Sequence, residues 1–375
     1  MSRAEKVLIV GGGIGGMTLG TALHHAGIAA EIVELSPDWA VIGYGISVQG
    51  ATLRALKTIG VLDQCVRAGF GYSKLFVCKA DGEVTGTVEL PSLLGEGYPE
   101  CLGMMRPALA RILRDALAAE RVPVRTGLTV ETFHQKGDTV DVWFTDGSRG
   151  SYDLVVGADG VHSRMRQMLF GDGVQPVDMG QAVWRAMVPR APEIRGRHSF
   201  YGPRHKCGLN PVSEDEMYVF LVEPTAARER VPDPELPARM RALLADFDGV
   251  IARAREHITR PERIVRRPLD CLLLPSPWYR GRVLLIGDAA HAPTPQLASG
   301  AGMAVEDAIV LAELLAQELS VEGVLERFMV RRYERCRMVV EASRQLSEWE
   351  KAPNSPGADP VGLLARTNAA LAAPI

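Results

Sequence analysis

The sequence predicts an α/β protein in which a domain built on a parallel sheet is interrupted by a mainly antiparallel β-sheet domain. Near the start, an apolar segment (7–10), a glycine-rich turn and a helical stretch (14–25) follow one another, and a similar apolar segment returns at 283–286. Between about 171 and 280 the sequence consists of short segments in which apolar and polar residues alternate, separated by Pro and Gly. This pattern is typical of an antiparallel sheet. We therefore expect a discontinuous Rossmann-like domain, an inserted antiparallel sheet and C-terminal helices.

The glycine-rich turn fits the pattern GxGxxG at Gly11, Gly13 and Gly16. Gly11 permits a tight turn, Gly13 lets backbone approach a pyrophosphate, and Gly16 lets the helix pack closely on the strand. Phosphates would then face the helix N-terminus, where free N–H groups favour anions. Glu34 ends the next strand, where a carboxylate can accept hydrogen bonds from ribose hydroxyls. A glycine-rich turn alone is often only a turn, but this order of elements predicts a dinucleotide site, for either FAD or NAD.

The same periodicities predict the remaining elements. A helical segment at 53–68 has a break at Gly60, and another helix starts at Pro107. A further helix is expected around 239–247, and the region 336–350 is helical. Short strands are predicted at 122–124, 128–133, 140–144, 154–156 and 217–222.

These elements suggest two domains and a tail. The dinucleotide-binding domain is expected to comprise residues 1–70, 101–170 and 281–350. The substrate domain is expected to comprise residues 71–100 and 171–280, and residues 351–375 form a C-terminal tail. A length of 375 residues suits about two domains with well-developed cores.

Composition excludes several classes of function. A net charge of −3 does not favour binding to nucleic acid or to an anionic membrane. The six cysteines contain no CxxC pair, and the eight histidines show no ligand spacing, so we expect no metal site and a reducing compartment. The first strand begins within about six residues, which leaves no room for a signal peptide. Since no apolar run approaches the roughly 20 residues of a membrane span, a cytoplasmic protein is expected.

Two turns that contain aspartate help to decide between FAD and NAD as the cofactor. Asp159 and Gly160 follow one apolar strand and Asp288 follows another, at the strand ends where open α/β sheets collect ligands. Alone, such an Asp is often a helix cap or a turn former. Together with GxGxxG, however, the chain resembles the flavin-dependent aromatic hydroxylases of the para-hydroxybenzoate hydroxylase type, which are single-component FAD monooxygenases. The matching stretches are 7–34, 43–56, 105–113, 153–166 and 281–308.

The resemblance implies FAD as cofactor and assigns residues to it. Val130 would border the adenine, Arg106 would reach the ribityl and phosphate region, and Asp288 would bind a ribityl hydroxyl. Asp159 would serve both FAD placement and the NAD(P)H step, and we expect it to hold its loop through Arg164 or Arg166. The residues that would hold the AMP half are Gly11, Gly13, Ile14, Gly15, Gly16 and Glu34.

Gly300, Ala301 and Gly302 open a predicted helix with a buried face. Glycine there would let the flavin ring lie against bare backbone, and a helix N-terminus would stabilise the anionic reduced flavin. Tight helix packing is the alternative explanation. Relatives often have Gly-Gln-Gly where this chain has Ala298, Ser299 and Gly300.

The resemblance also implies the reaction. NAD(P)H, a transient co-substrate, reduces FAD, O2 gives a flavin C4a-hydroperoxide, and one oxygen passes to an electron-rich aromatic or N-heterocyclic substrate. Arg185, Lys206 and Tyr218 are candidate catalytic residues, since a cation could hold a carboxylate or phenolate and a tyrosine could relay a proton. Urate hydroxylases of the family have a cation and a tyrosine near Lys206 and Tyr218. Gln49 and Pro295 are expected near the ring.

Other interpretations stay open at this point. His291 follows Asp288 in a tight turn and is expected to be a packed structural residue. The same scaffold could carry out epoxidation, Baeyer–Villiger oxidation or tetracycline-type inactivation, or could bind flavin without turnover. The sequence leaves the substrate, NADH versus NADPH, and a monomer or homodimer undecided.

Overall fold

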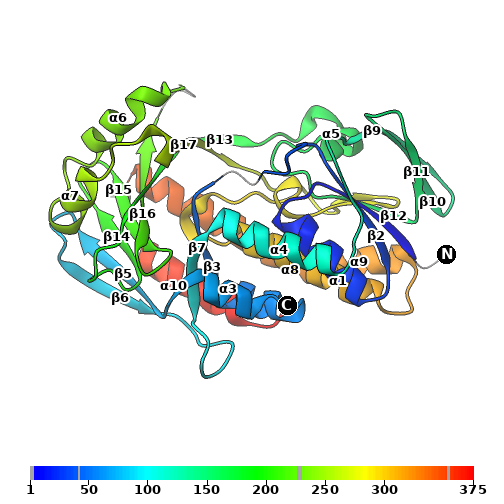
Figure 1. Ribbon diagram of the computed structural model, residues 1–375, viewed down its shortest axis with the longest axis horizontal. Coiled ribbons are helices and arrows are strands. Elements are labelled where there is room, and N and C mark those ends of the chain that lie inside the picture. Colours follow the sequence, from blue (N-terminus) through cyan, green and yellow to red (C-terminus); the bar gives the residue numbers. More distant parts are fainter. Residues whose placement is uncertain (1–3, 41–42, 226–229, 353–354) are drawn as a thin grey trace.

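Figure 1 shows the computed structural model, in which a parallel sheet with its helices and a large antiparallel sheet occupy opposite ends of an elongated molecule. The structure describes residues 4–40, 43–225, 230–352 and 355–375. Long helices run beneath both ends and join them.

The parallel sheet has the strand order β18-β19-β12-β1-β2-β8. Its central strand β1 pairs in parallel with β2 and β12, and only the edge strand β18 is antiparallel. Every residue of β12 is buried, because helices or loops cover both faces. The strands are β1 (Lys6–Val10), β2 (Ala29–Glu34), β8 (Val124–Thr126), β12 (Leu154–Gly157), β18 (Tyr279–Arg280) and β19 (Val283–Leu285).

Two buried helices pack closely beside this sheet. Helix α1 (Ile14–His25), which has the predicted bounds, contacts α8 (Gly300–Leu315) where a Cβ on Gly15 would lie 3.2 Å from the Cβ of Ala304. Nearly all of α8 is buried, so its sequence shows little amphipathic contrast. Helix α4 (Arg106–Ala119) packs on α1 and places a proline in its first turn.

The antiparallel sheet has the order β17-β13-β16-β15-β14-β5-β6, with only the β14–β5 pair parallel. Helices α6 (Leu236–Leu243) and α7 (Gly249–Glu256) cover one face and share a second apolar core with it. The strands are β5 (Lys74–Lys79), β6 (Val84–Glu89), β13 (Val177–Pro189), β14 (Arg197–Tyr201), β15 (Lys206–Pro211), β16 (Glu216–Pro224) and β17 (Ile264–Cys271).

Smaller elements complete the fold. Strands β3 (Gly45–Gln49), β4 (Gly69–Tyr72) and β7 (Cys101–Met105) form one small sheet, and β9 (Val130–Lys136), β10 (Thr139–Phe144) and β11 (Arg149–Tyr152) form another. The remaining helices before residue 300 are α2 (Gly50–Thr58), α3 (Leu62–Ala68), α5 (Arg164–Phe170), η1 (Gly171–Gly173), η2 (Asp233–Glu235), η3 (Pro261–Arg263), η4 (Gly287–Ala289) and η5 (Pro295–Leu297).

Helix α9 (Val321–Lys351) crosses the molecule from the parallel sheet toward the antiparallel sheet (Figure 1). Its 31 residues span about 46 Å at 1.5 Å per residue. The segment expected as a tail contains a further helix, α10 (Pro360–Ala372), which packs on α9 and α2. Arg54 donates to the carbonyl oxygens of Ala372 and Ala373, so the end of this helix is held.

The predicted fold class is confirmed: a Rossmann-like parallel sheet, antiparallel sheets and C-terminal helices are all present. The exact domain boundaries stay a prediction. The helix expected at 239–247 begins earlier, at Leu236, because Pro237 occupies its first turn.

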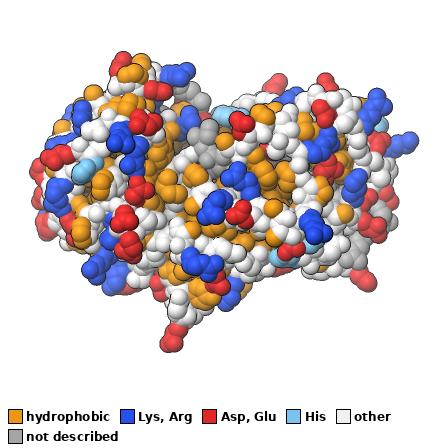
Figure 2. All heavy atoms as spheres, viewed as in Figure 1, with side chains coloured by type: hydrophobic (Ala, Val, Ile, Leu, Met, Phe, Trp, Pro, Cys, Tyr) orange, Lys and Arg blue, Asp and Glu red, His pale blue; other side chains and the backbone are white. Residues whose placement is uncertain are grey.

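The molecular surface carries charges of both signs. Figure 2 shows Lys, Arg, Asp and Glu side chains interspersed over the visible face, without a large patch of one sign. No helix within the described ranges is both long and apolar enough to span a bilayer.

Candidate active site

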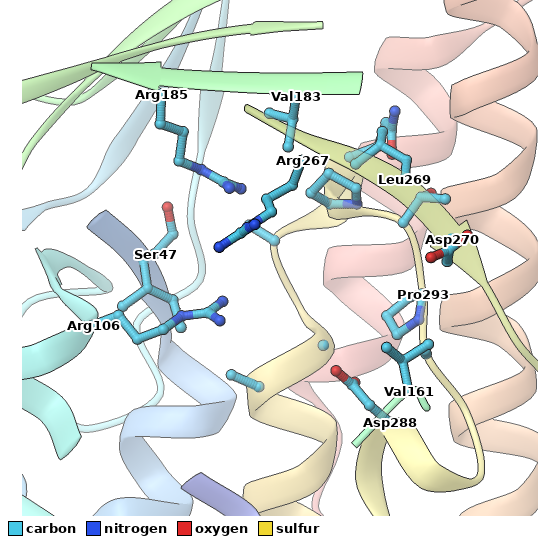
Figure 3. A pocket seen from close by; sticks show the side chains of 18 of the residues that line it. Ser47, Arg106, Val161, Val183, Arg185, Arg267, Leu269, Asp270, Asp288 and Pro293 are labelled. Atoms are coloured by element: carbon cyan, nitrogen blue, oxygen red, sulfur yellow. The ribbon is translucent and has the colours of Figure 1, made fainter. Parts of the chain in front are cut away.

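A cavity of about 520 Å³ lies between the two large sheets. On one side, its lining comes from the glycine turn after β1, from the turn after β12, and from η4, η5 and the start of α8. On the other side, side chains of β13 to β17 form its wall. Figure 3 shows these two sides facing each other, with Asp288 below and Arg185 and Arg267 above. The cavity thus opens at the carboxyl ends of parallel strands, where α/β folds bind ligands.

The glycine turn has the backbone geometry that its sequence predicts. Gly11 has φ +112°, and a Cβ there would overlap the carbonyl of Ala158. A Cβ on Gly16 would overlap the carbonyl oxygen of Gly11, whereas one on Gly13 would meet no protein atom within 4 Å. Gly11 and Gly16 are therefore required for chain packing, and Gly13 leaves open space for a ligand.

Helix α1 begins at this open space without a side-chain cap. Gly13 is the N-cap residue, no side chain accepts from the first turn, and Gly13, Ile14 and Gly15 line the cavity. The N-terminus of α8 also has no side-chain cap, and Gly300 and Ala301 line the same cavity. Two positive helix ends therefore face one space, which favours a ligand with anionic groups.

Glu34 and Val130 lie outside the lining of this cavity. The Glu34 carboxylate accepts hydrogen bonds from the backbone N–H groups of Gly12 at 2.7 Å and Ser36 at 2.8 Å. Glu34 is thus fixed beside the glycine turn, at the end of β2. Val130 is fully buried in the apolar core. Their assignment to the AMP half of the cofactor stays a prediction.

Asp159 organises its own loop, through hydrogen bonds that come mainly from the start of α5 (Arg164–Phe170). Its carboxylate accepts from the Ser163 hydroxyl at 2.5 Å and from the Met165 N–H at 3.0 Å, rather than from an arginine side chain. The Arg166 guanidinium instead donates to the carbonyls of Val161 and Ala289. The backbone N–H of Arg164, in the first turn of α5, also donates to the carboxylate, so the expected hydrogen bond with Arg164 comes from its backbone. The pKa of Asp159 is raised overall, because the effect of burial is larger than the opposite effect of these hydrogen bonds, which lower it.

Asp288 projects into the cavity from η4. Desolvation by the surrounding protein raises its pKa, while His291 and Arg106 act in the opposite direction. Its side chain is exposed where it lines the cavity, and one oxygen would lie 4.0 Å from a Cβ on Gly300. Gly302 does not line the cavity, because it packs against the Thr52 hydroxyl of α2. Of the two glycines, Gly300 faces the ligand space and Gly302 serves helix packing.

His291 belongs to a buried ionic network behind the cavity. Its Nε2 lies 2.6 Å from Asp307, which also accepts from Arg332 at 2.7 Å. Arg332 pairs with Glu306 at 2.8 Å as well, so α8 and α9 are joined by charges with no exposed surface. His291 also packs on the ring of Trp278. The structural role predicted for His291 agrees with this geometry.

Tyr218 and Arg185 both reach the cavity from the antiparallel sheet. The Tyr218 hydroxyl accepts from the Asn210 amide at 2.9 Å, and that amide also donates to Ser47. A Cβ on Gly45 would overlap the Tyr218 ring, so the ring fills the space above this glycine. Burial lowers the pKa of Arg185, Tyr218 opposes that shift, and Arg106 adds to it.

Lys206 lines the cavity but already has a counter-ion. Its ammonium lies 2.6 Å from Glu350 in the last turn of α9, and the two side chains are 15% and 8% exposed. Gln296 donates to the other oxygen of Glu350 at 2.9 Å. Burial lowers the pKa of Lys206, but Glu350 outweighs this, so the pKa is raised overall. Pro295 begins η5 beside this pair and also lines the cavity, whereas Gln49 bonds the Leu297 carbonyl outside it.

The sequence prediction missed several charged lining residues: Arg197 on β14, Arg267 and Asp270 on β17, and Glu350 on α9. Strand alternation could have placed Arg267 on the same face as Leu269, but the strand itself was not predicted. No local pattern brings Glu350 to Lys206, because 144 positions separate them.

The FAD-binding-domain model matches residues 4–343. The chain belongs to this family of flavoprotein monooxygenases. It is 31% identical over 357 residues to the aurachin C monooxygenase/isomerase of Stigmatella aurantiaca, covering 94% of this chain and 92% of the relative. It is 35% identical over 312 residues to the 2-heptyl-3-hydroxy-4(1H)-quinolone synthase of Pseudomonas aeruginosa, covering 82% and 80%. The prediction that the chain is an FAD-dependent monooxygenase is therefore confirmed.

A solved structure has the same fold along nearly the whole monooxygenase chain. HpxO of Klebsiella pneumoniae, complexed with FAD and uric acid, superposes with a TM-score of 0.83 at 26% identity, covering 98% of this chain and 92% of that one. FAD is the cofactor. The residues present fit it: the open space at Gly13, the two uncapped helix ends and the Asp288 carboxylate offer sites for phosphates and ribityl hydroxyls.

Proposed function

We propose that this monooxygenase uses NAD(P)H and O2 to hydroxylate a small, electron-rich aromatic or N-heterocyclic compound. The observation that carries the proposal is the wall of the cavity opposite Asp288, where Tyr218, Phe220 and Arg185 supply a phenol, an apolar ring and a cation. The relatives support it, since the quinolone named for one and the uric acid bound to another are nitrogen heterocycles.

Bound FAD, once reduced, supplies the activation of O2, and the chain supplies binding, orientation and proton transfer. Because the Tyr218 hydroxyl accepts from Asn210, its own O–H is available to a group in the cavity. It would orient a substrate hydroxyl or ring nitrogen and pass a proton to or from it. Phe220 and Val222 would pack on the ring and keep water from the reacting atoms.

The test is substrate-stimulated oxidation of NADH or NADPH by the FAD-reconstituted enzyme under 18O2. The panel comprises phenols, aromatic acids and hydroxylated pyridines. We expect at least one compound to accelerate nicotinamide oxidation and to gain one 18O atom on a ring carbon. A product with an epoxide or an inserted ester oxygen would instead identify one of the alternative oxidations. Oxidation that yields only hydrogen peroxide with every compound would contradict the proposal.

Tyr218→Phe separates the role of the hydroxyl from that of the ring. We expect kcat for the best substrate to fall by about 10²-fold, the lower end of what general acid–base catalysis contributes. The loss should be smallest at high pH, where the substrate hydroxyl ionises without help. FAD content should be unchanged, because Tyr218 lies on the sheet opposite the glycine turn. An unchanged kcat across pH would remove Tyr218 from the mechanism.

A further inference from the structure

Asn210 is a fully buried amide that joins two hydroxyl groups of the cavity lining. Its Nδ2 donates to the Tyr218 hydroxyl at 2.9 Å and to the Ser47 hydroxyl at 3.1 Å. Tyr218 and Ser47 both line the cavity, whereas Asn210 does not. One amide outside the cavity therefore holds two hydroxyl groups inside it.

The packing of two sheets brings these three side chains together. Asn210 on β15 and Tyr218 on β16 are direct partners in the antiparallel ladder. Ser47 comes from the small sheet, where it is paired with Gly103 of β7. A Cβ on Gly103 would overlap the carbonyl oxygen of Pro211, so glycine there lets the small sheet approach β15 closely. Figure 3 shows the resulting position of Ser47, with its oxygen directed toward the antiparallel sheet.

The Asn210 amide faces the two hydroxyl groups with its nitrogen. Its Oδ1 has no hydrogen-bond partner among the residues that the structure describes. A reversed amide would leave two buried N–H donors unpaired in place of one oxygen, which is the more costly arrangement. Since a hydroxyl oxygen that accepts a hydrogen bond keeps its own O–H for another partner, this orientation makes both hydroxyl groups donors toward the cavity.

Ser47 accepts a second hydrogen bond, from the buried Tyr72 hydroxyl at 3.3 Å. Burial raises the pKa of Tyr72 well above its ordinary value, so Tyr72 stays protonated and can donate. With two hydrogen bonds accepted, the Ser47 oxygen is left with its own O–H as its free hydrogen-bonding group. Tyr72 thus supports the same role for Ser47 that Asn210 imposes.

The spacing of the two donors suits a single oxygen atom. The two N–H bonds of an amide diverge by about 120°, so oxygens 2.9 and 3.1 Å from one nitrogen lie about 5 Å apart. A carbonyl or phenolate oxygen that accepts two hydrogen bonds of about 2.8 Å along its lone pairs requires donors at about the same spacing.

We propose that Asn210 is a positioning residue that holds Ser47 and Tyr218 as a two-donor site for one carbonyl or phenolate oxygen of the substrate. This inference rests on the proposed function and names the substrate group that this part of the cavity selects. An amino group at the same ring position would meet two donors and would leave them unpaired.

The test compares uncharged ligands with and without the oxygen on the FAD-loaded enzyme. The probes are 4-chromanone beside chroman, and 4-quinolone beside quinoline at pH 8, and the change in flavin absorbance reports binding. We expect at least one carbonyl compound to bind tenfold or more tightly than its parent. Its infrared carbonyl band should move to lower frequency on binding, because two donors polarise the bond. If every parent binds as tightly as its carbonyl compound, or no carbonyl compound binds, the inference is overturned.

Asn210→Asp keeps the size of the side chain but presents acceptors to both hydroxyl groups. Their O–H bonds should turn to the carboxylate, so the carbonyl compound should bind at least tenfold more weakly while its parent binds as before. Asn368→Asp is the matched control, because Asn368 is also a buried amide, lies on α10 and does not line the cavity. Equal weakening of carbonyl compound and parent by Asn210→Asp would assign Asn210 a merely structural role and overturn the inference.

Ser47→Ala tests the second donor without introducing a buried charge, and so decides the matter even if Asn210→Asp does not fold. The carbonyl compound should bind about fivefold more weakly, and its infrared band should return part of the way to higher frequency because one hydrogen bond remains. An unchanged band would show that Ser47 does not contact the oxygen, which contradicts a two-donor site.

The two proposals fail in different ways. If a carbonyl compound binds through Ser47 and Asn210 but no compound gains 18O from 18O2, the two-donor site stands and the proposed hydroxylation falls. If a compound gains oxygen while Ser47→Ala and Asn210→Asp leave affinity and band unchanged, hydroxylation stands and the two-donor site falls.

Discussion

At the scale of single residues, the pair of Lys206 and Glu350 changes how the cavity charges are interpreted. A lysine on the cavity wall is an obvious anchor for an acidic substrate, but a carboxylate from α9 already neutralises it. Both side chains are largely buried, so removing one partner leaves the other charge poorly solvated. The pair therefore holds the end of α9 on the sheet.

Glu350→Gln should reduce the free energy of unfolding by about 3 kcal/mol, the usual cost of breaking a buried pair. Lys206→Met combined with Glu350→Gln should recover much of this loss, because no buried charge then remains. The pKa of Lys206 is raised in the native state. Its contribution to stability is thus present below the ordinary lysine pKa of about 10.4 and lost as pH rises through the higher native value. Glu350→Gln should abolish that alkaline loss.

Urea unfolding of the FAD-loaded wild type, of Glu350→Gln, of Lys206→Met and of the double variant, at pH 8 and pH 11, measures both effects. Additive effects of the two single substitutions would mean that the side chains do not interact.

Gly11 and Gly13 allow folding to be separated from cofactor binding. Gly13→Ala should leave the stability of the apoprotein unchanged, because its Cβ meets no protein atom within 4 Å. It should raise the Kd for FAD about tenfold, or about 1.4 kcal/mol, by filling space that the pyrophosphate needs. Gly11→Ala should instead destabilise the apoprotein, since its φ is +112° and its Cβ overlaps Ala158.

Fluorescence titration with FAD, together with thermal unfolding of the apoprotein, distinguishes the two glycine variants. Equal FAD affinity in wild type and Gly13→Ala would place the pyrophosphate elsewhere.

Motif residues were predictable because local sequence determines their geometry. The turn at Gly11 and the strand-end carboxylate of Asp288 follow from chain order and glycine conformation alone. Arg267 and Glu350 could not be predicted in this way, since their roles depend on which strands and helices become neighbours. Asp159 falls between the two cases: its loop was predicted, but which donors reach the carboxylate depends on the geometry of the first turn of α5.

At the scale of elements, the contact between α8 and α9 depends on charges inside the core. Arg332 lies between Glu306 and Asp307, with all three side chains fully buried. Asp307 also accepts from the Gly287 N–H, immediately before Asp288. The network therefore connects the helix pair to the turn that presents Asp288 to the cavity.

Arg332→Met should reduce the free energy of unfolding by about 3–5 kcal/mol, because the buried Asp307 loses its guanidinium and Glu306 keeps only Arg335. Burial alone would raise the pKa of Asp307, but His291 and Arg332 lower it below its ordinary value. Its stabilising contribution is present above the ordinary carboxyl pKa of about 3.9 and lost as pH falls through the native value. Without Arg332 that loss should begin at higher pH, and the midpoint of acid unfolding should rise.

Arg337→Met is the control on the same helix, since Arg337 forms exposed pairs with Glu334 and Glu341. It should change neither stability nor the acid midpoint measurably. Circular dichroism during acid titration follows both variants, and coincident curves for Arg332→Met and wild type would contradict the role of the network.

Elements with strong local signals were predicted best. Helix α1 follows directly on a glycine-rich turn, and strand β12 is an unbroken apolar segment that ends in glycine, so their positions are nearly independent of the rest of the chain. Helix α10 was expected as a tail, because Pro and Gly precede it and its helical signal is weak. It is stabilised by contacts with α9 and α2 and by the Arg54 bonds, which no local pattern reveals.

At the scale of the whole molecule, two apolar cores lie on either side of the cavity. One packs the parallel sheet with α1, α8 and α9, and the other packs the antiparallel sheet with α6 and α7. The cavity residues belong to both parts, so a ligand that fills the cavity binds only when the two are correctly placed. Cofactor binding should therefore stabilise the molecule as a unit.

FAD at a hundred times its Kd should add about 2.7 kcal/mol to the free energy of unfolding. Riboflavin at the same concentration should add much less, since it lacks the pyrophosphate that would face α1. Differential scanning calorimetry of the apoprotein with each ligand measures the difference. Equal stabilisation by the two compounds would contradict the role assigned to the glycine turn.

The contact between Gly45 and Tyr218 has a consequence for the evolution of this enzyme. Because any side chain at position 45 would occupy the space of the Tyr218 ring, position 45 cannot change while that ring is present. A descendant that acquires alanine or serine at 45 must first replace the tyrosine with a smaller residue, and it thereby gives up the phenol in the cavity. A change at position 45 would therefore come only after the ring at 218 is lost, and the tyrosine could return only after glycine is restored at 45.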